Sequence, residues 1–287
     1  MPRSGTCAAA DGTALAWRAT GQGPPLVLAN GVTTTDVAWG PLLSRWAADR
    51  RVISWDYKGH GDSAPARSPE AVTMAALADD LRRVMDAAGV ARAPVCGYSM
   101  GSQVAFEAYR AIPDRVDAIV SVLGPVRRML DTALYGIGGR TVEQLLKVLP
   151  GPAVPAVGWA AKLATRAPGI YAAGRAMRLF GSETGPRDIA GYIDHFRRLD
   201  MPTVRWMVLA AAAHDATDVL AHAEVPVLLV CGGKDVFAPA DEVGQLMHAM
   251  APGSRMVLLP DGTHGSPFGH ADRIGRAVDE FFADCGL

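Results

Sequence analysis

Apolar residues along the chain gather in short runs that end at turn residues. Several runs, such as PLVLANG and VPVLLVCGG, are almost unbroken. Strands that are hydrophobic on both faces are typical of a parallel sheet covered by helices on both sides. The pattern predicts strands at 15–20, 25–31, 51–57, 93–99, 117–124, 225–233 and 255–262.

Segments of helical period lie between these runs, with apolar residues three or four positions apart. Alternation of strand and helix predicts an α/β fold with a mostly parallel central sheet flanked by helices. The Asp-Gly pair at 11–12 predicts a hairpin, so the first strands should be antiparallel. The clearest helical segments are 74–89, 102–112, 240–251 and 273–285.

The alternation of strands and helices stops between residues 125 and 222. This stretch contains helix-like pieces separated by Gly and Pro, and no convincing strand. It is too long for a simple crossover loop. We therefore predict a helical insertion at 125–222, placed within a core that is formed by 1–124 and 223–287.

Composition and charge exclude several classes of function. The 49% apolar content supports a sizeable core, and a net charge of −1 gives no basic excess for nucleic acid or anionic lipid. Neither a secretory signal nor a run of 18 apolar residues is evident, so we expect a soluble, cytoplasmic protein. The oligomeric state stays open, and a homo-oligomer is compatible with the sequence. Four scattered cysteines form no ligand cluster, and we expect no metal and no cofactor; they are Cys7, Cys96, Cys231 and Cys285.

The stretch GYSMG, at 97–101, places one serine between two glycines where a strand meets a helix. This context is that of a nucleophile elbow, in which a sharp turn exposes the serine hydroxyl. The glycines leave room for the strand and the helix to pass closely. An ordinary glycine-rich turn is the alternative, and the downstream partners favour Ser99 as a nucleophile.

A serine hydroxyl needs a base to remove its proton, and the base needs a third group to orient it. For an elbow of this type, an acid and then a histidine should follow the serine along the chain. Asp235 directly follows the run at 225–233, and His264 follows the run at 255–259. Loops after parallel strands emerge at one edge of a sheet. The predicted triad is therefore Ser99, Asp235 and His264.

Alternatives to the acid and the base are present in the sequence. Asp241 begins a helical pattern and suits an N-terminal helix charge. Asp131 comes seven residues after the Gly-Pro that ends its strand. His270 also follows the last strand, where we expect a surface residue near the start of the terminal helix. The other histidines that we considered fall in the insertion or on a helix, namely His195, His214, His222 and His248.

Acyl transfer develops an oxyanion that needs preorganised N–H donors. One donor should be the backbone N–H of Met100, directly after the serine. The other should come from the loop Asn30-Gly31-Val32-Thr33, and we assign it to the N–H of Val32. A tight turn without chemistry is the alternative for this Asn-Gly pair.

The chain resembles the α/β-hydrolase fold family through five motifs in the family's order. They are Asn-Gly after a strand, WDYKGHGDS at 55–63, GYSMG, GGKD and GTHG. The resemblance covers nearly the whole chain and implies that 125–222 is the family's helical cap over the pocket. It also implies structural turn roles for Asp56 and His60. One departure is Asn30, which stands where many relatives have a histidine.

These observations predict a serine hydrolase that cleaves a carboxylic ester, thioester or lactone through an acyl-enzyme on Ser99. The alternatives are a carbon–carbon bond hydrolase, a cofactor-free perhydrolase of the haloperoxidase type, and a non-catalytic ligand-binding protein. Serine in place of aspartate at the elbow argues against epoxide hydrolase or dehalogenase chemistry.

The composition of the insertion predicts the kind of substrate. Its apolar side chains either hold it on the core or roof a pocket for a small to medium hydrophobic substrate. Arg127 or Arg128 would favour anionic substrates if either turned inward. The apolar side chains in question are Trp159, Leu163, Met177, Phe180, Trp206 and Met207.

Overall fold

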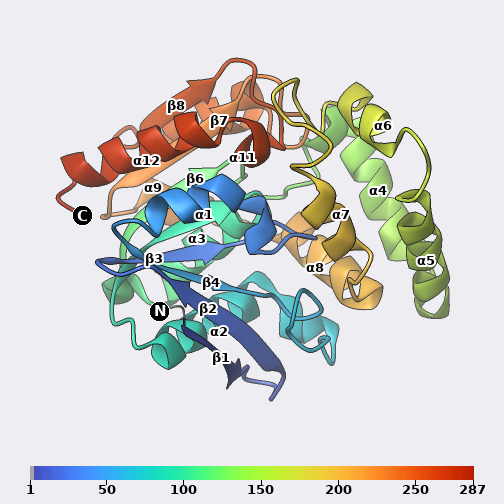
Figure 1. Cartoon of the computed structure of the whole chain (residues 1–287), viewed down its shortest axis with the longest axis horizontal. Coiled ribbons are helices and arrows are strands. Elements are labelled where there is room, and N and C mark those ends of the chain that lie inside the picture. Colours follow the sequence, from blue (N-terminus) through green and yellow to red (C-terminus); the bar gives the residue numbers. More distant parts are fainter. Residues whose placement is uncertain (1–2) are drawn as a thin grey trace.

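The computed structural model describes residues 3–287, so the first two residues of the predicted core lie outside the described part. One eight-stranded sheet runs through the molecule in the order β1-β2-β4-β3-β5-β6-β7-β8 (Figure 1). Its strands are β1 (Arg3–Ala8), β2 (Ala14–Thr20), β3 (Pro25–Ala29), β4 (Arg51–Trp55), β5 (Ala93–Tyr98), β6 (Val116–Val122), β7 (Val227–Gly232) and β8 (Arg255–Leu259).

The sheet is antiparallel only around β2, which pairs in this way with β1 and with β4. The pairs from β4 through β3, β5, β6 and β7 to β8 are parallel. The predicted hairpin and the mostly parallel sheet are both confirmed. Leu26 and Leu28 contribute to one hydrophobic cluster, and Val27 contributes to the other. Strand β3, which contains these three residues, is hydrophobic along its length because both of its faces are covered.

Helices cover the two faces of the sheet separately. On one face, α1 (Gly40–Trp46) packs against α12 (Ala271–Asp284), next to the short α11 (Ser266–Gly269). On the other face, α2 (Met74–Ala88) packs against α3 (Met100–Ala111), and α3 against α9 (Thr217–Ala221). A π-helical turn, η6 (Ala240–Gly244), leads into α10 (Gln245–Met250), which contacts α9.

Local sequence signals set the bounds of α2. The hydroxyl of Thr73 accepts a hydrogen bond from the N–H of Ala76 and caps the first turn. Gly89 ends the helix in the left-handed region at φ 68°, where glycine carries no Cβ penalty. The predicted helix at 74–89 therefore agrees with the structure to within one residue.

The segment between β6 and β7 is helical, as the sequence predicts. Figure 1 shows α4, α5 and α6 gathered at the outer side of the molecule, with α7 and α8 nearer the sheet. The division into core and cap itself stays a prediction. The helices of this segment are α4 (Ile137–Val148), α5 (Val154–Ala164), α6 (Ile170–Ala176), α7 (Ala190–Phe196) and α8 (Met201–Ala213), followed by α9.

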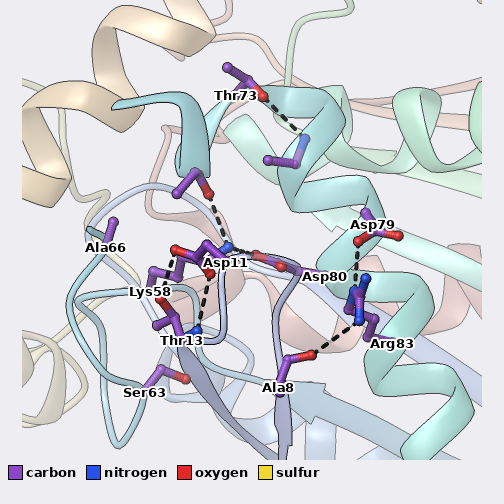
Figure 2. A network of polar contacts seen from close by, with 12 residues as sticks. Ala8, Asp11, Thr13, Lys58, Ser63, Ala66, Thr73, Asp79, Asp80 and Arg83 are labelled. Atoms are coloured by element: carbon purple, nitrogen blue, oxygen red, sulfur yellow. Dashed lines mark hydrogen bonds and ion pairs between the residues drawn. The ribbon is translucent and has the colours of Figure 1, made fainter. Parts of the chain in front are cut away.

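A buried ion pair holds the loop that follows β4. The ammonium of Lys58 donates to a carboxylate oxygen of Asp80 on α2 and to the carbonyl oxygen of Ala71 (Figure 2). Both charged side chains are almost completely buried. Asp56, in the same loop, accepts from Arg18 and from the N–H of Asp62. These contacts agree with a structural role for Asp56.

Within residues 3–287, every helix is too short or too polar to cross a lipid bilayer.

Candidate active site

Ser99 lies at the corner between β5 and α3 in a strained backbone conformation, with φ 54° and ψ −122°. Non-glycine residues rarely adopt such angles, and they persist where the surroundings fix them. A Cβ on Gly97 would lie 2.2 Å from the carbonyl oxygen of Gly101, and one on Gly101 would lie 2.1 Å from that of Ala29. Only glycines fit beside this serine, so the GYSMG stretch forms the predicted elbow.

The three predicted triad residues meet at this corner. The Nε2 atom of His264 lies 2.9 Å from the Oγ atom of Ser99. Its Nδ1 atom lies 2.9 Å from Oδ2 and 3.1 Å from Oδ1 of Asp235. Hydrogen-bond distances of this size allow the imidazole to accept the serine proton while the carboxylate fixes the tautomer. The arrangement can therefore generate a serine nucleophile.

Backbone donors hold the carboxylate of Asp235, which is 4% exposed, after the end of β7. Its Oδ1 atom accepts from the N–H of Phe237 at 2.7 Å and from the N–H of Ala238 at 3.0 Å. The phenol of Tyr98 donates to the carbonyl oxygen of His264, and the ring centroid of Phe237 lies 4.8 Å from that of His264. Tyr98 and Phe237, which the sequence analysis did not single out, thus position the imidazole.

The alternative acids and base lie elsewhere. Asp131 pairs with Arg128 at the surface, and Asp241 is exposed and accepts from Gln245 one turn later. The expectation that His270 is a surface residue was wrong, because it is 8% exposed. Glu183, from the predicted cap segment, has its Oε2 3.9 Å from the Nε2 of His270.

The loop after β3 passes directly over the serine. A Cβ on Gly31 would lie 3.2 Å from the Cβ of Ser99 and from the ring of Tyr98. Asn30 fixes the start of this loop, since its Nδ2 donates to the carbonyl oxygen of Trp55 and its Oδ1 accepts from the indole of Trp39. The asparagine at this position therefore anchors the loop to the core.

Thr33 ends this loop, and its N–H donates to Nε2 of His60 at 3.1 Å. The Nδ1–H of His60 can donate to the carbonyl oxygen of Lys58, which leaves Nε2 as the acceptor. Burial lowers the pKa of His60 to about 4, so the ring is neutral at neutral pH. In the described part of the chain, the N–H groups of Val32 and Met100 find no acceptor, so both can donate to an oxyanion.

A cavity of about 510 Å³ opens beside the triad, and residues from both the predicted core and the predicted cap segment line it. Its walls are mostly apolar. None of the described lining residues is Arg, Lys, Asp or Glu. Arg127 and Arg128 are exposed and lie outside the wall, so neither forms the carboxylate clamp considered from the sequence. Residues of the segment 125–222 in the wall include Met177, Phe180, Ile189, Tyr192, Ile193 and Phe196.

The predicted set of apolar cap residues divides in three. Met177 and Phe180 line the cavity, and Trp206 and Met207 pack with the core. Trp159 and Leu163 are 65% and 43% exposed, so they neither roof the pocket nor hold the cap on the core. Their helix, α5, packs on α8 through its other face, where Gly158 approaches Met201.

Comparison with known proteins places this geometry in a family. The model of the α/β hydrolase fold matches residues 24–271. A putative carbamate hydrolase, RutD, from Caulobacter sp. strain K31 is 24% identical over 265 residues, which cover 90% of each chain. The enol-lactonase from Burkholderia xenovorans LB400 is similar with a TM-score of 0.75 and 24% identity, over 97% of this chain and 100% of that chain.

The esterase RhEst1 from Rhodococcus sp. ECU1013 is similar with a TM-score of 0.72 and 26% identity, over 98% of each chain. The family match spans most of the 287 residues and includes the elbow, the loop after β3 and both downstream triad positions. The chain belongs to the α/β hydrolase fold family, a family of hydrolases, as its motifs predicted.

Proposed function

We propose that this hydrolase is a serine esterase or lactonase that cleaves a neutral, largely apolar ester, thioester or lactone through an acyl-enzyme on Ser99. The observation that carries the proposal is the 2.9 Å separation of Ser99 Oγ from His264 Nε2 at the wall of an apolar cavity.

The chemistry proceeds in two halves. His264 accepts the proton as Ser99 Oγ attacks the carbonyl carbon, and Asp235 stabilises the imidazolium. The N–H groups of Val32 and Met100 hold the oxyanion. His264 then gives the proton to the leaving oxygen or sulfur, and a water molecule, deprotonated by the same imidazole, hydrolyses the acyl-enzyme.

The cavity wall supports a neutral substrate of small to medium size. A volume of about 510 Å³ is within the range of small-molecule sites, which are mostly apolar with a few placed polar groups. A carboxylate in this wall would lose its hydration without gaining a cationic partner. The names of the relatives, an enol-lactonase, an esterase and a carbamate hydrolase, favour cleavage of a carbonyl–heteroatom bond.

Labelling with a fluorophosphonate tests the nucleophile. We expect one label, located on Ser99 by peptide mass spectrometry and absent from Ser99→Ala. Ser102→Ala is the matched control, because Ser102 is three residues away and its hydroxyl donates to the carbonyl oxygen of Gly97. It should label normally. A label that persists in Ser99→Ala would exclude Ser99 as the nucleophile.

A substrate panel tests the reaction. We expect kcat/KM to be highest for neutral p-nitrophenyl esters and lactones, and low for carboxylate-bearing esters of equal length. Arg127→Ala and Arg128→Ala should leave this order unchanged, because both side chains are exposed. If vinylogous diketones, or hydrogen peroxide with a carboxylic acid, are turned over faster than esters, the corresponding alternative reaction replaces ester hydrolysis as the proposed function.

A further inference from the structure

Besides the serine of the triad, the cavity wall contains five hydroxyl groups, those of Thr33, Thr34, Tyr98, Thr165 and Tyr192. Three of them donate their protons to backbone carbonyl oxygens within the protein. Thr34 donates to the carbonyl oxygen of Gly31 at 2.9 Å, and Tyr98 donates to that of His264 at 2.9 Å. Thr165 donates to the carbonyl oxygen of Lys162 at 2.6 Å. These three hydroxyls therefore have no proton left for a substrate.

Thr33 and Tyr192 differ from the other three hydroxyls. Their oxygens lie 3.2 Å apart and share one hydrogen bond between the loop after β3 and the cap helix α7. Two hydroxyls carry two protons, and one hydrogen bond uses only one of them. Among residues 3–287, neither hydroxyl has another partner. One O–H donor is thus left without an acceptor at the cavity wall.

The relative acidity of the two groups assigns the spare proton to Thr33. The 3.2 Å contact allows either oxygen to donate. Because a phenol is a stronger acid than an aliphatic alcohol and is the better donor, we assign the donor role to Tyr192 and the acceptor role to Thr33 Oγ1. Burial raises the pKa of Tyr192 above its ordinary value, and the phenol stays protonated at neutral pH. A hydroxyl that accepts a hydrogen bond becomes a stronger donor through its own proton.

The backbone of Thr33 supports a role for its side chain. Its φ is 65°, a left-handed conformation that is costly for a β-branched residue. Glycine or asparagine would adopt it more easily. The bond from its N–H to His60 holds the residue in place directly after Val32, the proposed oxyanion donor. The chain thus keeps a strained threonine beside the reaction centre.

We propose that the Thr33 hydroxyl, oriented by Tyr192, donates a hydrogen bond to an oxygen of the substrate that lies a few bonds from the scissile carbonyl. The preferred substrate is therefore a neutral ester or lactone with an ether, keto or hydroxyl oxygen near that carbonyl. A purely hydrocarbon acyl chain that fills the cavity would leave the Thr33 hydroxyl without an acceptor. Such an ester should therefore be hydrolysed more slowly. The proposal rests on the proposed esterase function.

Isosteric ester pairs test this preference. The p-nitrophenyl esters of methoxyacetate, 3-methoxypropanoate and 4-methoxybutanoate pair with those of butanoate, pentanoate and hexanoate. For each pair the kcat/KM ratio of the methoxy to the alkyl ester is compared between wild type and variants, so intrinsic ester reactivity cancels. For at least one pair, Thr33→Val should lower the ratio by about 3- to 10-fold, the effect of one neutral hydrogen bond.

Two further variants separate substrate contact from a structural role. Thr33→Ser keeps the hydroxyl and should keep the wild-type ratio. Tyr192→Phe leaves the Thr33 hydroxyl unoriented and should lower the ratio by less than Thr33→Val. Ratios that stay at the wild-type value in Thr33→Val, or an equal loss of rate for both members of every pair, would overturn the proposal.

A binding measurement separates this proposal from the proposed function. In a Ser99→Ala background, 4-methoxybutan-2-one should raise the melting temperature more than hexan-2-one, and Thr33→Val should abolish the difference. If this preference appears although no ester is hydrolysed, the donor role stands and the esterase function fails. If esters are hydrolysed and neither the ratios nor the melting temperatures distinguish the pairs, the donor role alone fails.

Discussion

The hydroxyl of Ser99 lies 2.9 Å from the imidazole of His264, although 165 positions separate the two residues in the chain. Ser99 directly follows β5, and His264 follows β8, three strands farther along the sheet. Because β5, β6, β7 and β8 are parallel, the loops at their carboxyl ends emerge at one edge. Proton transfer between the two side chains therefore depends on the sheet topology.

Replacement of the predicted acid should reduce turnover strongly. In Asp235→Asn the amide stabilises the wrong tautomer of His264, and kcat for a neutral ester should fall by about 10⁴. Asp131→Asn and Asp241→Asn are matched controls that should retain kcat, since neither carboxylate contacts the imidazole. Steady-state kinetics on the four proteins decides between the three acids. Near-normal kcat in Asp235→Asn would show that another group orients the base.

His60 should support catalysis through the oxyanion loop. In His60→Phe, the N–H of Thr33 loses its acceptor and the N–H of Val32 loses its fixed direction. We expect kcat to fall by about 10-fold, less than for loss of an oxyanion donor itself, with little change in KM. His60→Gln offers a carbonyl oxygen to the same N–H and should recover part of the loss.

The split between kcat and KM distinguishes positioning from binding. Equal falls of kcat in His60→Phe and His60→Gln would argue against the hydrogen bond to Thr33. A rise of KM with unchanged kcat would place His60 in substrate binding instead. Circular dichroism of each variant checks that the fold is retained.

The buried ion pair between Lys58 and Asp80 should matter mainly when only one partner is removed (Figure 2). Burial raises the pKa of Asp80 to about 6, and the neighbouring ammonium offsets only part of that rise. Lys58→Met should therefore lower the free energy of unfolding by about 3–5 kcal/mol, because it leaves a buried carboxyl without its partner. Lys58→Met/Asp80→Leu should recover most of this loss.

Urea titration of the single and double variants measures these differences. The exposed pair Arg255 and Asp284 is the control, and Arg255→Met should cost less than about 1 kcal/mol. If the double variant is no more stable than Lys58→Met, the ion pair itself stabilises the fold, and the two charges do more than neutralise each other.

Acid should destabilise the contact between the predicted cap segment and the predicted core at two histidines, His60 and His195. The ring centroids of His60 and His195 lie 5.7 Å apart. Burial lowers the pKa of each ring to about 4. The nearby Arg198 lowers that of His195 further, and Asp200 acts in the opposite direction on His60. Both rings are neutral in the folded protein at neutral pH.

The sign of the effect follows from proton uptake. Between about pH 6.5 and pH 4 the unfolded chain binds protons at these rings and the folded chain does not, so stability falls as the pH falls. Above pH 6.5 the two histidines contribute no pH dependence. The total loss should be on the order of a few kcal/mol.

Melting temperatures measured from pH 7 to pH 4.5 test the histidine pair. His195→Phe should flatten the decline, because neither ring nitrogen of His195 has a partner among the described residues. His222→Gln, at an exposed position, should decline like wild type. A wild-type slope in His195→Phe would place the acid sensitivity at other groups, His214 first, whose pKa burial also lowers to about 4.

The fold could be predicted from patterns of neighbouring residues along the chain. Nearly continuous apolar runs such as β7 predicted strands that are buried on both faces, and the Asp-Gly pair predicted the antiparallel start of the sheet. These features depend on backbone geometry and on residues close in sequence, which a single chain displays directly. The burial of His270 was missed because it depends on packing with distant segments, such as that of Glu183, whose carboxylate lies 3.9 Å from its Nε2.

By itself the sequence determined the elbow at Ser99, because only glycines fit beside a serine in that conformation, and it indicated Asp235 and His264 because both follow strands of the same sheet. Tertiary structure alone decided the contact of Tyr192 with Thr33, and it decided that Trp159 faces outward. Helical periodicity shows that a segment has an apolar face but not which surface that face meets. That choice is made by packing between segments far apart in the chain, and it shapes the cavity that selects the substrate.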